Sequence, residues 1–126
     1  MNTFDIKKII NFDYLPIKKG DNINTVIGFL GKPIDIHKSK KSNIVILKYN
    51  HIQITFIDNI IYAYTLYAIN LNVPIFLDIF CDFLFLEKIV YVKEKGMADS
   101  IVIVLQNNIK CYFDSNEELH GISVEY

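Results

Sequence analysis

Two cysteines, three histidines and fourteen carboxylates are the residues of this 126-residue chain that could do chemistry. Cys111 and His51 suggest a nucleophile with its base, and Asp78 and Asp82 stand one helical turn apart, as paired acid–base carboxylates can. Neither pair belongs to a recognisable catalytic motif. In a strand, Cys111 would point to the same side as the apolar core-face residues, so we expect a packed thiol there and a solvated helix face at the aspartates. The sequence therefore predicts no enzyme activity.

The patterns that hold metals and cofactors are also missing. His37, His51 and His120 lie far apart and show none of the close spacings of metal ligands. The five glycines are isolated, so no glycine-rich loop could hold a phosphate group. We expect no metal and no cofactor. A disulfide between Cys81 and Cys111 is conceivable, but two buried thiols are the expectation.

Charge is nearly balanced overall but unevenly distributed along the chain. All 13 basic residues are lysines and the net charge is −1. Residues 1–63 carry nine lysines and five acids, and residues 64–126 carry four and nine, which gives +4 and −5. Lys38, Lys40 and Lys41 form a small basic cluster, too small a footprint to neutralise a nucleic-acid backbone. We expect no nucleic-acid binding.

Composition indicates a globular protein of the cytoplasm. Apolar residues make up 52% of the chain and charged residues 21%, which suits one folded domain of this length. The N-terminal residues lack the basic head and apolar block of a secretory signal. The most apolar span, 60–86, contains a proline, two asparagines and two carboxylates, which argues against a membrane helix. We expect a cytoplasmic protein without a membrane partner.

The elements that must position these residues are organised around the stretch 44–68. Three runs rich in Ile, Val, Thr, Tyr and Phe are separated by the dipeptides Asn50-His51 and Asp58-Asn59. Asn and Asp tolerate positive φ angles better than other non-glycine residues, so both dipeptides suit tight hairpin turns. The stretch predicts a three-stranded antiparallel meander.

The two turns fix which residues face each other. The first places Leu47 opposite Ile54, and the second places Phe56 opposite Ile61 and Ile54 opposite Ala63. These residues are expected on one apolar face. The side chains expected on the opposite, half-wet face are Lys48, Gln53, Thr55, Tyr62 and Tyr64.

The meander recurs further along the chain. Residues 101–113 match residues 44–56 at a constant offset of 57, which aligns Asn50 with Asn107 and Phe56 with Phe113. A third strand follows over 121–126, after a looser turn at 115–118. Chance similarity is the alternative, because Ile and Val interchange freely in strands. We predict two tandem units, about 21–70 and 74–126, within a single domain of residues 1–126.

Helices are predicted before each meander and at the start of the chain. The first is expected from a cap at Asn2-Thr3 to about residue 12, and the second from Asn22 to Leu30, ending at Gly31. The span 74–87 has helical apolar spacing, with a strand as the alternative. A basic loop over 37–43 and an extra strand over 89–92 complete the prediction. The fold class is α+β, an antiparallel sheet with helices on one face.

Residues 22–67 resemble a known group of small bacterial proteins. The resemblance lies in Leu30-Gly31-Lys32-Pro33, the lysine-rich loop after it, and the pattern Ile46-Leu-Lys-Tyr-x-x-Ile-x-Ile-x-Phe56. The group comprises immunity and antitoxin proteins of polymorphic toxin systems, including contact-dependent growth inhibition. This chain departs from the pattern at Asn50, where Gly is expected. The layout is also loosely similar to the β-lactamase inhibitor protein and to an outer-membrane assembly lipoprotein, whose lipid-anchor signal is missing here.

The resemblance implies a stoichiometric inhibitor of a cognate bacterial toxin. An acidic C-terminal half would complement a basic nuclease-type toxin domain, and tyrosines would anchor the complex. The alternatives are a small regulatory binding domain or homodimer, and then an enzyme. We expect a monomer or weak homodimer. The residues expected to contact the partner are Asp99, Lys110, Tyr112, Asp114, Glu117, Glu118, Glu125, Tyr126, Tyr62 and Tyr64.

Overall fold

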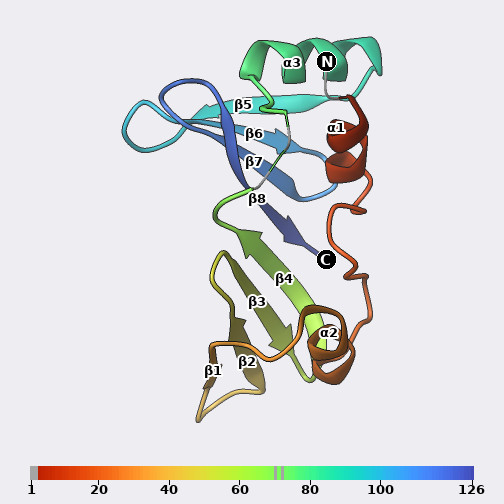
Figure 1. Cartoon of the computed structure of the whole chain (residues 1–126), viewed down its shortest axis with the longest axis vertical. Helices are drawn as coiled ribbons and strands as arrows, with labels where there is room; N and C mark the ends of the chain where they lie inside the picture. Colours follow the sequence, from red (N-terminus) through yellow and green to blue (C-terminus); the bar gives the residue numbers. More distant parts are fainter. Residues whose placement is uncertain (1–2, 70, 72) are drawn as a thin grey trace.

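The computed structural model describes residues 3–69, 71 and 73–126. Within them the chain forms three short helices and eight strands (Figure 1). The helices are α1 (Thr3–Ile10), α2 (Ile23–Leu30) and α3 (Leu77–Leu86). The strands are β1 (Asp35–Lys38), β2 (Ile44–Lys48), β3 (Ile52–Ile57), β4 (Ile60–Leu66), β5 (Tyr91–Lys95), β6 (Ile101–Leu105), β7 (Ile109–Phe113) and β8 (Leu119–Glu125).

All eight strands belong to one antiparallel sheet in the order β1-β2-β3-β4-β8-β7-β6-β5. The strands β1–β4 form a first meander after α2, and the strands β5–β8 form a second meander after α3. The two meanders meet where β4 pairs with β8, with Thr65 opposite Ser123. The α+β class and the antiparallel sheet are confirmed. Each meander has four strands, so the predicted three are too few.

The helix α2 begins and ends where its capping residues predict. The side chain of Asn22 accepts a hydrogen bond from the Thr25 backbone N–H at 2.8 Å, which satisfies one of the free donors of the first turn. Gly31 adopts a φ of 84° and its N–H donates to the Ile27 carbonyl at 2.8 Å. The span predicted over 74–87 contains the helix α3, which begins at Leu77 and ends at Leu86 and buries Phe80 and Leu84, so the strand alternative is wrong.

The hairpin registers are confirmed only as far as a bulge in the middle of β4. Leu47 lies opposite Ile54, as predicted, and Phe56 lies opposite Ile61. The pairing then skips Tyr62, so Ile54 faces Tyr64 where Ala63 was predicted. One extra residue reverses the face of every later side chain. Tyr64 therefore points into the core, and its predicted place on the half-wet face is wrong.

A second bulge lies in the corresponding place of the second meander. Phe113 faces Leu119 and Tyr112 faces Gly121, so the pairing skips His120. Phe56 and Phe113, which are separated by the predicted offset of 57, each lie next to the register shift of their hairpin. The offset is not constant, however. Leu47 lies opposite Ile54, whereas Ile103 lies opposite Cys111, so the turn between β6 and β7 is one residue longer.

Several predicted boundaries change. The basic loop over 37–43 begins with strand residues, because Asp35–Lys38 pairs with β2 at the edge of the sheet. The extra strand over 89–92 is β5, which starts at Tyr91 and ends at Lys95. The first helix spans Thr3–Ile10 and is shorter than predicted. The predicted cap at Asn2, and Asn70 and Asn72 of the predicted break, lie outside the described residues.

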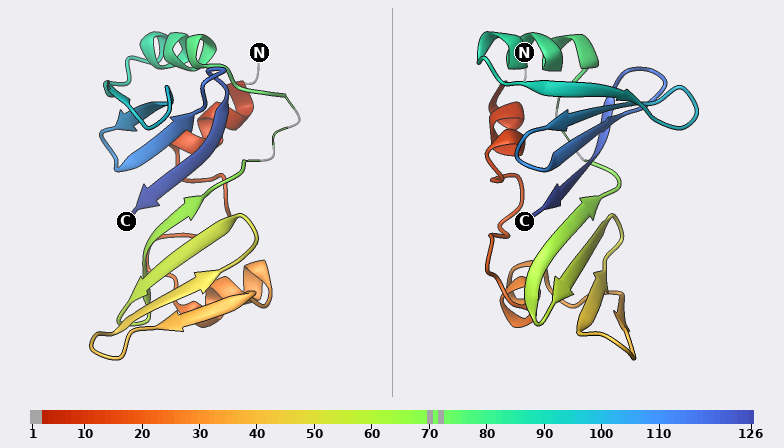
Figure 2. Two further views of the ribbon diagram at one scale, coloured as in Figure 1. Left: turned by 90° about the vertical axis from the view of Figure 1, so that its left-hand side faces the viewer. Right: turned by 180° about the vertical axis from the view of Figure 1, so that it is seen from behind.

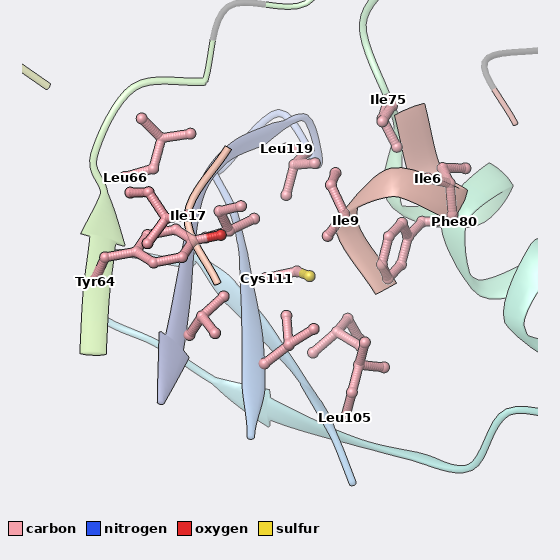
Figure 3. Close-up of a cluster of buried hydrophobic side chains, with 14 of the residues drawn as sticks. Ile6, Ile9, Ile17, Tyr64, Leu66, Ile75, Phe80, Leu105, Cys111 and Leu119 are labelled. Atoms are coloured by element: carbon pink, nitrogen blue, oxygen red, sulfur yellow. The ribbon is translucent and has the colours of Figure 1, made fainter. Parts of the chain in front are cut away.

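One hydrophobic cluster joins the helices to one face of the sheet. Figure 3 shows its upper part, where Ile6 and Ile9 of α1 and Phe80 of α3 gather with Leu105 and Cys111 of the strands. All five side chains are at most 3% exposed. The left view in Figure 2 looks onto the strands, with α1 and α2 behind them. Among the described residues, no helix covers the opposite face, which carries Thr65, Tyr112 and Ser123, and we call it the outer face.

Candidate interaction surfaces

The acidic residues among the predicted contacts divide between two ends of the second meander. The turn that follows β5 and the turn that follows β7 lie at the same end of the sheet, because Ile101 pairs with Phe113. This acidic end carries Asp99, Asp114, Glu117 and Glu118. Glu125 and Tyr126 lie at the opposite end of β8, beside Asn108 and Tyr62. The predicted residues therefore do not form one continuous site.

At the acidic end, one carboxylate stabilises its own turn. The Asp114 side chain accepts hydrogen bonds from the backbone N–H groups of Asn116 at 2.9 Å and Glu118 at 3.1 Å. Glu117, in the turn between β7 and β8, adopts a φ of 61°. The hydrogen bonds to Asp114 support this left-handed conformation. The side chain of Glu117 is exposed. Glu117 and Asp99 are thus the carboxylates most available to a partner, and Asp114 holds the turn.

Tyr126 is part of the core boundary, although the sequence suggested a surface anchor. Its ring lies 6.0 Å from that of Phe12 and 6.3 Å from that of Tyr64. Its hydroxyl donates to the Ile17 carbonyl oxygen at 3.3 Å. Burial raises the pKa of the Tyr126 hydroxyl to about 12. Tyr64 beside it is 2% exposed and cannot reach a partner directly.

The other two predicted tyrosines remain at the surface. Tyr62, the bulge residue of β4, is 40% exposed and donates a hydrogen bond to Oε1 of Glu125 at 2.9 Å. This bond and the negative charge of Glu125 raise the pKa of the Tyr62 hydroxyl. Tyr112 lies on the outer face, where its hydroxyl is 3.1 Å from that of Ser123. Both tyrosines keep ring area available for contact.

A shallow depression occupies the centre of the outer face, where β4 meets β8 and β7. It has a volume of about 230 Å³. Its lining includes the small residues Ala63, Thr65 and Ser123, together with the charged residues Lys110 and Glu125. Local patterns in the sequence do not predict this depression, because it depends on pairing between strands from the two halves of the chain. Such a depression can receive one side chain of a partner.

The residues considered for catalysis do not come together. Cys111 is fully buried and burial raises its thiol pKa to about 12, whereas His51 is exposed in the turn after β2. Asp78 and Asp82 are exposed on α3, and the Asp78 carboxylate accepts from the Ile79 N–H at 2.8 Å. In the described part of the chain, no three His, Cys, Asp or Glu side chains gather as metal ligands would.

Two further findings concern the described residues as a whole. Cys81 and Cys111 are both free thiols. Across residues 3–69, 71 and 73–126, no helix is long and apolar enough to span a membrane.

Comparison with known proteins bears on the fold of the chain and not on its function. The chain is similar to the solved structure of an extracellular protein containing a SCP domain from Bacillus anthracis str. Ames, with a TM-score of 0.52 and 11% identity. The match covers 83% of this chain and 43% of that one, so this chain spans less than half of that protein's length. No protein family model and no curated protein matches the chain.

Proposed function

We propose that this chain is a stoichiometric protein-binding protein that neutralises a cognate bacterial toxin. The observation that supports it best is the open outer face of an eight-stranded sheet, flanked by an acidic end. Tyr112 offers the surface of its ring for contact, and the depression at the β4–β8 junction can receive a side chain of the partner. Exposed acids such as Glu117 and Asp99 suit a basic, nuclease-type toxin domain, because opposite charges speed association.

The proposal includes the absence of catalysis by the chain alone. Cys111 is buried with a raised pKa, so its thiol is a poor nucleophile at neutral pH. Asp82 is exposed on α3, and among the described residues it belongs to no group of three His, Cys, Asp or Glu side chains. Turnover of a nucleic acid, ester or peptide that is abolished by Cys111→Ser or Asp82→Asn would contradict this part.

We also infer that the two meanders derive from one duplicated unit. Three correspondences support this inference: a helix precedes each meander, a bulge adjoins Phe56 and Phe113, and the last strand of each meander pairs with the other. The residue before each helix adds a fourth, since Asn22 bridges to Ile60 and Phe76 bridges to Glu118. Under this inference the acidic end is a specialisation of the second unit.

The test is binding to the protein encoded by the neighbouring gene. We expect a 1:1 complex, measured by light scattering and by association kinetics at low salt. The double change Glu117→Lys and Glu118→Lys should slow association by roughly tenfold, because steering by opposite charge is lost. The control is Lys40→Glu with Lys41→Glu, an equal number of reversed charges in the first half of the chain, which should leave the association rate unchanged or raise it.

The second candidate function, a homodimeric regulatory domain, is favoured by one observation. The edge strand β1 carries Ile36, which is 46% exposed, next to Ile34, which is 68% exposed. A concentration-dependent dimer in light scattering, abolished by Ile36→Lys, would favour this function over the toxin inhibitor. A monomer at all concentrations would leave the inhibitor as the better explanation.

A further inference from the structure

The outer face of the second meander carries a cluster of apolar side chains. Val92 of β5 pairs with Val104 of β6, and Val102 of β6 pairs with Tyr112 of β7. Successive strand residues point to opposite faces, and Ile103 between the two β6 valines is fully buried on the core side. The four paired residues therefore lie together on the outer face. We call Val92, Val102, Val104 and Tyr112 the valine patch.

The valine patch is continuous and open to solvent. Residues directly opposite each other in an antiparallel pair are in contact, and the two pairs are joined through Val102 and Val104, which are neighbours on the same side of β6. Val92 is 56% exposed and the other three side chains are half-buried. Among the described residues, no helix covers this face of the sheet (Figure 2).

The first meander has mostly polar residues at the equivalent positions. The register shifts beside Phe56 and Phe113 align the two meanders strand by strand. Counted from these shifts, the equivalents of Val92, Val102, Val104 and Tyr112 are, in that order, Asp35, Ile46, Lys48 and Thr55. The pairing is the same in both meanders, since Asp35 lies opposite Lys48 and Ile46 lies opposite Thr55.

This comparison shows that the sheet does not require the valine patch. Asp35 and Lys48 form the same antiparallel pairing that Val92 and Val104 form, although aspartate and lysine are less favourable in strands than valine. The apolar side chains of the patch face water at a position where polar side chains support the same fold. Contiguous apolar surface of this kind is typical of a contact with another molecule.

The charges around the patch indicate which partner fits. Glu94 lies opposite Val102 on the outer face and is exposed. Val102 is one residue from the acidic end, where Asp99 and Glu117 are exposed. An apolar centre with a charged border is the usual anatomy of a protein–protein interface. The acidic border favours a basic partner over a second copy, because a second copy brings the same carboxylates with it.

We propose that the valine patch is the apolar centre of the toxin-binding interface. The partner places apolar side chains on the patch and lysine or arginine side chains beside Glu94, Asp99 and Glu117. This inference rests on the proposed function and deepens it by locating the contact on one half of the outer face. The patch holds the complex together, whereas the acidic end speeds its formation. The polar outer face of the first meander stays outside the interface.

The test is the binding kinetics of the purified product of the neighbouring gene with the full chain and its variants. Val102→Asn should raise the dissociation rate by roughly tenfold or more, because an apolar contact at the interface centre is lost. The association rate should stay nearly unchanged, because the net charge is unaltered. The matched control is Ile46→Asn, the same change at the equivalent half-buried position of the first meander, which should leave both rates unchanged.

A second variant, Val92→Asn, changes a more exposed residue of the edge strand β5 and should also speed dissociation. Thermal unfolding of each variant checks that the fold is retained. A wild-type complex whose dissociation rate is altered by neither patch variant, or equally by Ile46→Asn, would overturn this inference and leave the proposed function standing. Self-association of the chain that Val102→Asn abolishes would place a second copy on the patch and overturn it as well. A wild-type chain that does not bind the neighbouring gene product would overturn both.

Discussion

Tyr112 lies directly across from Gly121 in the pairing of β7 with β8. A Cβ atom on Gly121 would come within 2.8 Å of the Leu66 carbonyl oxygen of the neighbouring strand and within 3.8 Å of Cδ2 of Tyr112. The close approach of three strands beside the bulge therefore requires glycine at this position. The junction of the two meanders depends on this packing.

The variant Gly121→Ala should destabilise the protein by about 1–3 kcal/mol, because the backbone at Leu66 must move to admit the methyl group. Urea unfolding measures the change. The matched control is Gly28→Ala within α2, where a Cβ would meet nothing within 4 Å. That variant should stabilise the protein by about 0.5–1 kcal/mol, as alanine does in a helix. Equal effects of the two changes would contradict this account of the junction.

The cap of α2 provides a second stability prediction. The variant Asn22→Ala removes the side chain that accepts from the Thr25 N–H at 2.8 Å, so it should cost about 1 kcal/mol. The control Asn24→Ala alters an exposed asparagine inside the same helix and should be neutral or slightly stabilising. Thermal and urea unfolding of both variants test this. A neutral Asn22→Ala would show that the observed hydrogen bond does not stabilise the helix.

Local patterns in the sequence predicted local structure well. The caps at Asn22 and Gly31 act within a few residues, and the turn at Asn50-His51 fixes the register of its own hairpin. The bulge at Tyr62 could not be foreseen, because no residue type marks the place where a strand gains an extra residue. That single residue determines whether Tyr64 faces a partner or the core.

Features that depend on distant parts of the chain were missed. The strand β1 is only four residues long, and all four of its residues are exposed, so it shows no apolar alternation. The acids were predicted as one surface because they are near in sequence, but the length of β8 separates Glu118 from Glu125. The outer-face depression needs pairing between β4 and β8, which local periodicity does not specify.

The buried thiol of Cys111 predicts a loss of stability in alkali. Burial raises its pKa from 9.0 to about 12, so the folded state disfavours the thiolate. The contribution of the neutral Cys111 thiol to the free energy of unfolding is therefore fully present below pH 9. It is lost as the pH rises from 9 towards 12, by up to about 1.4 kcal/mol per pH unit. The variant Cys111→Val cannot ionise, so its stability should fall less between pH 9 and 10. Urea unfolding of both proteins over that pH interval tests the prediction. An equal fall in the free energy of unfolding for the two proteins would contradict it.

A ring contact between Phe80 of α3 and Phe113 of β7 predicts that these two side chains are energetically coupled. The two rings are edge to face, with centroids 5.4 Å apart and planes at 62°, and both side chains are fully buried. In a double-mutant cycle, Phe80→Leu and Phe113→Leu should show a coupling energy of about 0.5–1.5 kcal/mol. The control cycle pairs Phe80→Leu with Phe56→Leu of the first meander, where the effects should add within about 0.5 kcal/mol. If the first cycle is also additive, the edge-to-face contact contributes nothing beyond the apolar area it buries.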